Sequence, residues 1–134
     1  MISFLIALGA PAASPARCPP VQVAVAQPAT LSRALVRQVV SNFASAYAKA
    51  CAEGLLKRRP LVAARDKRLF LLNAPAANVA SIYERDGRMV LEYPFLSGGK
   101  ANVPTADELH ETIYCAVKGA TQAEQEESGR CLPD

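Results

Sequence analysis

Apolar residues recur at steps of three and four between residues 31 and 53, which is the spacing of one face of an α-helix. Thr30 or Ser32 can cap the start of this segment, and Gly54 can end it. The apolar stripe consists of Val36, Val39, Val40, Phe43, Tyr47, Ala50 and Cys51. The pattern therefore predicts a long helix over residues 31–53.

A β-hairpin is predicted further along the chain. Val79–Arg85 and Arg88–Tyr93 flank the dipeptide Asp86-Gly87, which favours a type I′ turn because both central residues adopt positive φ. This turn places Arg85 opposite Arg88 and fixes which residues share a face. The face expected to pack against the long helix carries Ala80, Ile82, Met89, Leu91 and Tyr93. The other, expected to be partly exposed, carries Ser81, Tyr83, Val90 and Glu92.

Two further extended segments precede this hairpin. The apolar runs Leu61–Ala64 and Leu69–Leu72 flank the charged segment Arg65–Arg68, which suggests another hairpin. Val21, Val23 and Val25 alternate within a proline-rich stretch, residues 13–29, which we interpret as an extended arm and a possible edge strand because prolines are tolerated there.

A shorter helix is predicted over residues 107–120. Thr105 and Glu108 have the spacing of a capping box, and Gly119 can end the helix. Ser97–Asn102, just before it, is rich in glycine and is expected to be a flexible loop.

These elements predict an α+β fold in which a long N-terminal helix packs on an antiparallel β-meander of about four strands, followed by a short C-terminal helix. This order resembles the cystatin-like or NTF2-like general architecture. The resemblance rests on element order alone and implies no function.

The N-terminus has features of an export signal. An apolar segment ends in small residues, with Ala10 and Ala12 in the small-x-small pattern that precedes a cleavage site. We therefore expect a signal peptide over residues 1–12, the arm over 13–29 and one α+β domain over 30–134, in a periplasmic or secreted protein. The alternative is an apolar N-terminal strand, because the segment is short and no basic residue precedes it. No apolar run reaches the roughly 18 residues of a membrane span.

The four cysteines are Cys18, Cys51, Cys115 and Cys131, and none belongs to a CxxC pair. The single histidine is not spaced with them as a zinc ligand would be, so we expect neither a metal nor a cofactor. An even number in a small exported domain favours two disulfides. We favour Cys18–Cys51 with Cys115–Cys131, which pins the tail; the alternative is Cys51–Cys115 with Cys18–Cys131.

Catalytic signatures are few. The chain has 134 residues, of which 51% are hydrophobic, so it can form a core and is not intrinsically disordered. It contains no GxSxG, P-loop or GxGxxG motif. His110 beside Glu111 could be a general base, but no nucleophile can be paired with it, and a solvated helix histidine is the preferred interpretation. We expect a protein that is not an enzyme.

Charge is distributed unevenly. Residues 17–68 hold ten basic and two acidic residues, whereas residues 69–134 hold five basic and ten acidic ones. A basic surface and a glycine-rich loop are therefore candidate contact sites for an acidic protein or an anionic envelope component. The candidate binding residues are Lys57, Arg58, Arg59, Arg65, Lys67, Arg68, Arg85, Arg88, Gly98, Gly99 and Lys100. Nucleic acid is not expected, because stacking aromatics are absent from the basic segment apart from Phe70.

The leading functional hypothesis is an exported, non-enzymatic binding protein, inhibitor-like or immunity-like, that uses basic hairpin tips and the glycine-rich loop. The alternative is a small-molecule binder with an apolar pocket between helix and sheet. That pocket would be lined by Phe43, Tyr47, Met89 and Tyr93. An enzyme that uses His110 is the third hypothesis.

Overall fold

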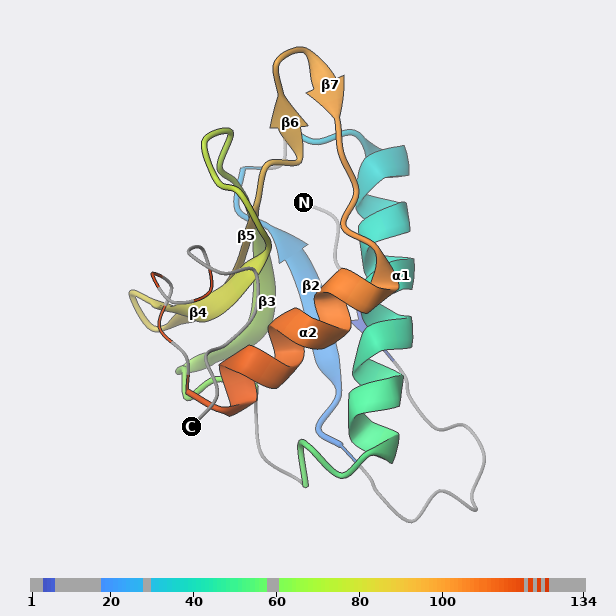
Figure 1. The fold of residues 1–134 in the computed structure, drawn as a ribbon, viewed down its shortest axis with the longest axis vertical. Helices are drawn as coiled ribbons and strands as arrows, with labels where there is room; N and C mark the ends of the chain where they lie inside the picture. The colour runs from blue at the N-terminus through green and yellow to red at the C-terminus, as the bar shows by residue number, and fades with distance from the viewer. Residues whose placement is uncertain are drawn as a thin grey trace.

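The computed structural model describes residues 4–6, 18–27, 30–57, 61–119, 121, 123 and 125. Helices and a mixed sheet confirm the predicted α+β class (Figure 1). The elements are β1 (Phe4–Ile6), β2 (Val21–Val25), α1 (Arg33–Ala52), β3 (Asp66–Asn73), β4 (Ser81–Arg85), β5 (Arg88–Tyr93), β6 (Leu96–Ser97), β7 (Lys100–Ala101) and α2 (Ala106–Val117).

The strand directions differ from the predicted antiparallel meander. The main sheet has the order β1-β2-β3-β5-β4, and β6 pairs with β7 separately. β2, β3 and β5 are parallel to one another, whereas β1 and β4 run antiparallel to their neighbours. The helix α1 is the crossover between β2 and β3, and its 20 residues return the chain to the end of the sheet from which β2 started.

The predicted hairpin around Arg65–Arg68 is wrong. Asp66–Asn73 forms one strand, and the segment before it is irregular although Leu61 is buried. β3 lies between two parallel neighbours, and its consecutive residues Leu69, Phe70 and Leu71 are all buried. Leu69 and Leu71 belong to the core, whereas Phe70 is covered on the other face by Arg68 and Arg88. β2, predicted as a possible edge strand, does not lie at the edge of the sheet, because β1 pairs with its other side.

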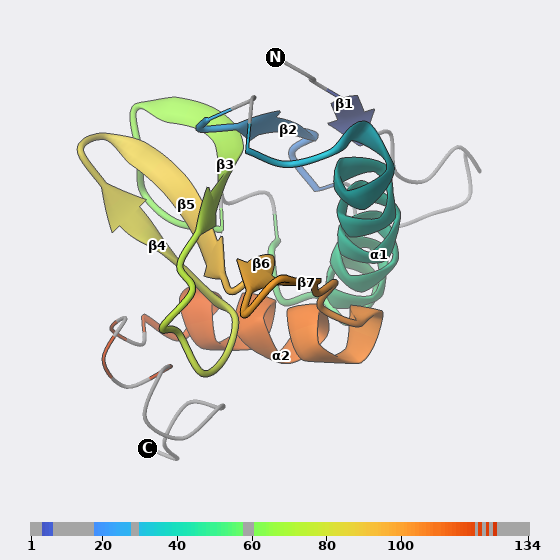
Figure 2. The same ribbon diagram turned by 90° about the horizontal axis from the view of Figure 1, so that it is seen from above.

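Both helices lie on one face of the curved sheet, which we call the inner face (Figure 2). The core fills the space between them, and the face of the β4–β5 hairpin that was predicted to be buried belongs to it. The opposite, outer face carries Ala24, Phe70, Val90 and Tyr83 in one row across four strands. On this face Ser81 and Glu92 are more buried than the sequence pattern suggested.

Both helices begin with the predicted caps. The Ser32 side chain accepts a hydrogen bond from the Leu35 amide at the start of α1, and Thr105 forms a capping box with Glu108 at the start of α2. Among the described residues, no helix is both long and apolar enough to cross a membrane.

A disulfide joins Cys18 to Cys51 and so ties the segment before β2 to the last turn of α1. The Tyr47 hydroxyl donates a hydrogen bond to the carbonyl oxygen of Pro19 beside it. Cys115 is also disulfide-bonded, and its predicted partner, Cys131, lies outside the described residues. The predicted pairing of Cys18 with Cys51 is therefore confirmed.

The outward edge of β4 is hydrogen-bonded to side chains instead of to another strand. The Ile82 amide donates to Oε1 of Gln125 (3.0 Å), and Nε2 of Gln125 donates to the Ile82 carbonyl oxygen (3.2 Å). The Thr112 hydroxyl of α2 donates to the carbonyl oxygen of Ala80. The side chain of Gln125 is itself buried.

The Asp86-Gly87 turn is confirmed. Asp86 has φ +53° and Gly87 has φ +80°, and Arg85 pairs with Arg88 as predicted. The turn is held by two further hydrogen bonds, because the Gly87 amide donates to Glu84 Oε2 (2.7 Å) and the Asp66 amide donates to the Gly87 carbonyl oxygen (2.9 Å).

The glycine-rich segment is also a turn instead of the predicted flexible loop. Gly98 and Gly99 have φ +58° and +77° and close the short β6–β7 hairpin, which projects at the top of Figure 1. Asn102 donates a side-chain hydrogen bond to the Pro94 carbonyl oxygen and joins the base of this hairpin to the end of β5.

We expect Gly87→Val to lower the free energy of unfolding by more than about 1 kcal/mol, because a β-branched residue is strained at positive φ. Gly98→Val meets the same backbone strain, yet it affects a hairpin of only two residue pairs, which can open locally at less cost. Urea denaturation of both variants measures the difference. Equal losses would contradict the central role given to the Asp86-Gly87 turn.

Candidate binding surface on the outer face of the sheet

The fold brings two basic segments of the sequence to one end of the sheet. The hydrogen bond from the Asp66 amide to the Gly87 carbonyl oxygen joins the start of β3 to the β4–β5 turn. Five of the predicted binding residues lie at this end: Arg65, Lys67, Arg68, Arg85 and Arg88. The basic residues therefore do share a region, although one of the two predicted hairpins does not exist.

The other predicted residues that the structure describes lie elsewhere. Gly98, Gly99 and Lys100 are at the β6–β7 turn, beyond the opposite end of β5. Lys57 follows the end of α1. Arg58 and Arg59 lie outside the described residues. The structure therefore separates the glycine-rich hairpin from the basic end of the sheet.

Phe70 is the centre of the outer face at this end. The guanidinium carbon of Arg68 lies 4.9 Å from the centroid of its ring, and that of Arg88 lies 4.7 Å from it. Both distances are within the range of a cation–π contact. The two arginines leave only 5% of Phe70 exposed to solvent.

Arg68 and Arg88 differ in how their charges are balanced. Arg68 forms a salt bridge with Asp66 at 2.8 Å, and this guanidinium lowers the pKa of the Asp66 carboxyl, mainly through the side-chain hydrogen bond. Arg88 and its cross-strand partner Arg85 form no salt bridge with any residue that the structure describes. Both are exposed. Arg88 helps to lower the pKa of the Asp66 carboxyl through its charge, yet it forms no salt bridge with it.

Tyr83 lies on the outer face of β4, next to Arg85. Its hydroxyl donates a hydrogen bond to Glu92 Oε1 (2.5 Å). Burial raises the pKa of Tyr83 to about 12, the hydrogen bond to Glu92 adds to the rise, and the nearby Arg85 opposes it. Tyr83 is therefore a neutral hydrogen-bond donor at neutral pH, and Glu92 is already engaged by it.

A shallow depression of about 460 Å³ opens between these groups. Its lining consists of Ala26, Phe70, Leu72, Val90, Arg85, Asp86 and Arg88. The first four form an apolar floor: Phe70 and Leu72 lie on β3, Val90 lies on β5, and Ala26 directly follows β2. The last three surround this floor at the β4–β5 turn. We refer to these seven residues as the outer-face depression.

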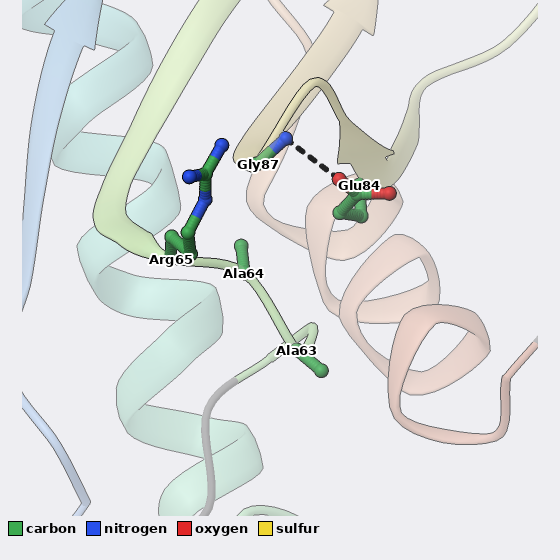
Figure 3. Close-up of a pocket in the computed structure, with 5 residues that line it drawn as sticks. All are labelled: Ala63, Ala64, Arg65, Glu84 and Gly87. Atoms are coloured by element: carbon green, nitrogen blue, oxygen red, sulfur yellow. Dashed lines mark hydrogen bonds between the residues drawn. The ribbon is translucent and has the colours of Figure 1, made fainter.

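A second hollow of about 410 Å³ lies beside the same turn (Figure 3). It is lined by Ala63, Ala64, Arg65, Glu84 and Gly87. The Arg65 guanidinium approaches the turn at Gly87, where a Cβ atom would lie 3.0 Å from its nitrogens. The Glu84 carboxylate accepts a hydrogen bond from the Gly87 amide, so the polar groups that line this hollow serve mainly to hold the turn.

His110 has a different acidic partner from the one the sequence suggested. Its Nε2 lies 2.6 Å from Oε1 of Glu53, just after α1, although Glu111 is its neighbour in the chain. The contact joins α2 to the end of α1. His110 therefore links the two helices through this contact with Glu53.

The residues of the hypothetical small-molecule pocket fill the core. Phe43, Tyr47 and Met89 are almost completely buried, and the first two stack at a centroid distance of 5.7 Å. Tyr93 packs edge-on against Phe95. These side chains leave the outer-face depression as the better-supported contact site.

Sequence reasoning missed the floor of the outer-face depression. The sequence pattern predicts a hairpin strand for Phe70 and Leu72 without fixing the face on which they lie, and it predicts a partly exposed Val90, which is buried. The alternation along β3 contained the signal, because Leu69 and Leu71 in the core place Phe70 on the other face.

Among the described side chains, no group of three or more His, Cys, Asp or Glu residues lies close enough to hold a metal ion. Comparison of the chain with models of protein families, with curated proteins and with solved structures finds no match. The outer-face depression is therefore interpreted from its own geometry and charge.

Proposed function

We propose that the chain is an exported, non-enzymatic binding protein that contacts an acidic partner protein through the outer-face depression. The observation that carries this proposal is the pair Arg85 and Arg88, two exposed arginines without a salt bridge to any described residue, beside an apolar floor that neither helix covers. Arginines beside an aromatic residue are typical of the central contacts of protein interfaces.

The disulfides support the export part of the proposal. Cys18 is bonded to Cys51, and Cys115 is also disulfide-bonded. Disulfides persist in oxidising compartments such as the periplasm and the extracellular space. The predicted signal peptide over residues 1–12 includes Phe4–Ile6, which forms β1 at the edge of the sheet. Removal of this segment would make β2 the edge strand of the sheet, paired with β3 only.

An acidic protein fits this surface better than a polyanion. Asp66 balances Arg68, and Asp86 lies between Arg85 and Arg88, so the positive charge is local instead of forming a long stripe. A nucleic acid backbone requires many cations along its length. A protein with one acidic patch matches a small group of arginines beside apolar residues.

The test uses the full oxidised protein and the double variant Arg85→Glu/Arg88→Glu as baits for proteins in envelope extract. We expect retention of an acidic protein by the wild type and its loss with the variant. With that protein purified, the association rate should fall for the variant, and wild-type binding should weaken as salt is raised. The free energy of unfolding should change by only about 1 kcal/mol, because both side chains are exposed.

The matched control is Arg33→Glu/Arg37→Glu, which makes the same change of charge on exposed positions of α1. It should retain the same protein at the same rate. If the Arg85/Arg88 variant retains it as well as the wild type does, the outer-face depression is not the contact surface. Retention of a lipid or glycan instead of a protein would replace the proposed partner class.

A further inference from the structure

On the basis of the proposed function, we propose that the outer-face depression is a subsite for one carboxylate side chain of the partner together with an adjoining apolar side chain. The ligand class is thus an acidic residue next to an apolar residue within a polypeptide. The inference adds the chemistry of recognition to the proposed contact surface.

The arrangement of Arg85 and Arg88 provides the anion contact. They are direct cross-strand partners beside a two-residue turn, and such partners project from the same face of a hairpin. Two like charges placed opposite each other are unfavourable unless an anion lies between them. Guanidinium groups match a carboxylate well because each can donate two parallel hydrogen bonds.

Existing contacts hold both arginines near this position without neutralising them. The Arg88 guanidinium rests over the Phe70 ring, and Arg85 lies close enough to Tyr83 to oppose the rise in the pKa of its hydroxyl. The charge of Arg68, by contrast, is neutralised by Asp66, to which its guanidinium donates two side-chain hydrogen bonds. The ligand anion is therefore assigned to Arg85 and Arg88, with Arg68 and Phe70 as support.

The local charge selects a singly charged ligand. The lining of the depression contains two arginines and one aspartate, which gives a formal charge of +1. A carboxylate neutralises this charge, whereas a phosphate monoester with nearly two negative charges would leave an excess beside Asp86. The depression is therefore suited to an aspartate or glutamate side chain.

The floor explains why an apolar side chain should accompany the carboxylate. Phe70, Leu72, Val90 and Ala26 are contiguous across the sheet and apolar. A volume of about 460 Å³ is within the range of ligand pockets, roughly 300–1,000 Å³. Phe70 and Val90 are already buried, but Ala26 is exposed and Leu72 is partly exposed. A carboxylate alone would leave these two side chains in contact with water, whereas a neighbouring leucine or phenylalanine would cover them.

The probe is a short peptide with both ends blocked and a central Glu-Leu pair in a glycine-serine background. It is titrated into the full oxidised protein labelled with ¹⁵N, and amide shifts are followed by NMR. We expect shifts at residues 70, 85, 88 and 90. Replacement of the peptide's Glu by Gln should weaken binding about tenfold, the size of one charge-assisted contact. Replacement of its Leu by Ala should weaken binding severalfold.

Protein variants localise the contact. Arg85→Gln and Arg88→Gln should each weaken peptide binding about tenfold, and Arg33→Gln on α1 should leave it unchanged. Thermal melting of each variant identifies any that is unfolded. Phe70→Leu, which keeps an apolar floor but removes the ring beneath Arg88, should weaken binding less than Arg88→Gln does.

Three results would overturn the inference. They are equal affinity for the Glu and Gln peptides, tighter binding of a phosphoserine-Leu peptide, and tighter binding of a peptide whose only carboxylate is a free C-terminus. Absence of shifts with every peptide would also overturn it, yet would leave the proposed contact surface standing if the Arg85/Arg88 variant still loses the envelope protein. The proposed function fails by itself if the Arg85/Arg88 variant retains the envelope protein as well as the wild type does, while the Glu-Leu peptide still binds the outer-face depression of the wild type.

Discussion

Replacing Cys18 and Cys51 together by serine is expected to lower the free energy of unfolding by about 4 kcal/mol, because the disulfide closes a loop of 33 residues. The loop contains β2 and most of α1, so without the bond the unfolded chain gains conformational freedom across the parallel β2–α1–β3 unit. Urea denaturation of the oxidised wild type and the double variant measures the loss.

The control is the wild type under reducing conditions, which should lose at least as much stability because Cys115 is also disulfide-bonded. Thiol titration of the denatured, unreduced protein should find no free thiol. A variant as stable as the wild type would show that contacts such as the hydrogen bond from Tyr47 to Pro19 alone fix the arm on α1.

Phe43→Ala is expected to cost about 3–5 kcal/mol, because it leaves a cavity where α1 faces the sheet. Phe43 is fully buried and stacks on Tyr47, so neighbouring side chains can fill the space only in part. Thermal or urea unfolding measures the loss. Tyr114→Ala on α2 is the matched control: Tyr114 is 41% exposed, and its loss should cost less than about 1 kcal/mol.

The same variant separates a core from a ligand pocket. If the aromatic residues of α1 only fill the core, Phe43→Ala destabilises the fold and leaves peptide binding at the outer face unchanged wherever the protein is still folded. If Phe43 instead lined a pocket for a small molecule, the variant would keep nearly full stability.

Local sequence signals predicted the parts of the fold that depend on neighbouring residues. The stripe from Val36 to Cys51 is a helix because its spacing is helical, and Asp86-Gly87 is a type I′ turn because those residues tolerate positive φ. The Cys18–Cys51 bond was favoured from the expected element positions and is present.

Strand direction could not be predicted in the same way. A strand has the same alternation whether its neighbour is parallel or antiparallel, so the alternation in Val21–Val25 does not reveal its parallel pairing. That pairing depends on the return of the chain through α1. The run Leu69–Leu71, buried on both faces, was the available indication of a central parallel strand.

The sequence predicted the charged residues of the candidate site but not their position in the fold. The sequence showed that Arg65, Arg68, Arg85 and Arg88 are basic. The parallel pairing of β3 with β5, together with the hydrogen bond from the Asp66 amide to Gly87, brings them to one end of the sheet. The sequence could not show that Asp66 neutralises Arg68, or that Phe70 lies beneath Arg88.

The hydrogen bonds of Gln125 bear on how the protein behaves at high concentration. A sheet grows when an exposed edge strand recruits a strand from another molecule, and such growth leads to insoluble aggregates. Here the amide of Gln125 satisfies both backbone groups of Ile82 that an incoming strand would need, while Thr112 engages Ala80. Gln125→Ala should therefore precipitate at lower concentration than the wild type, through intermolecular pairing at β4.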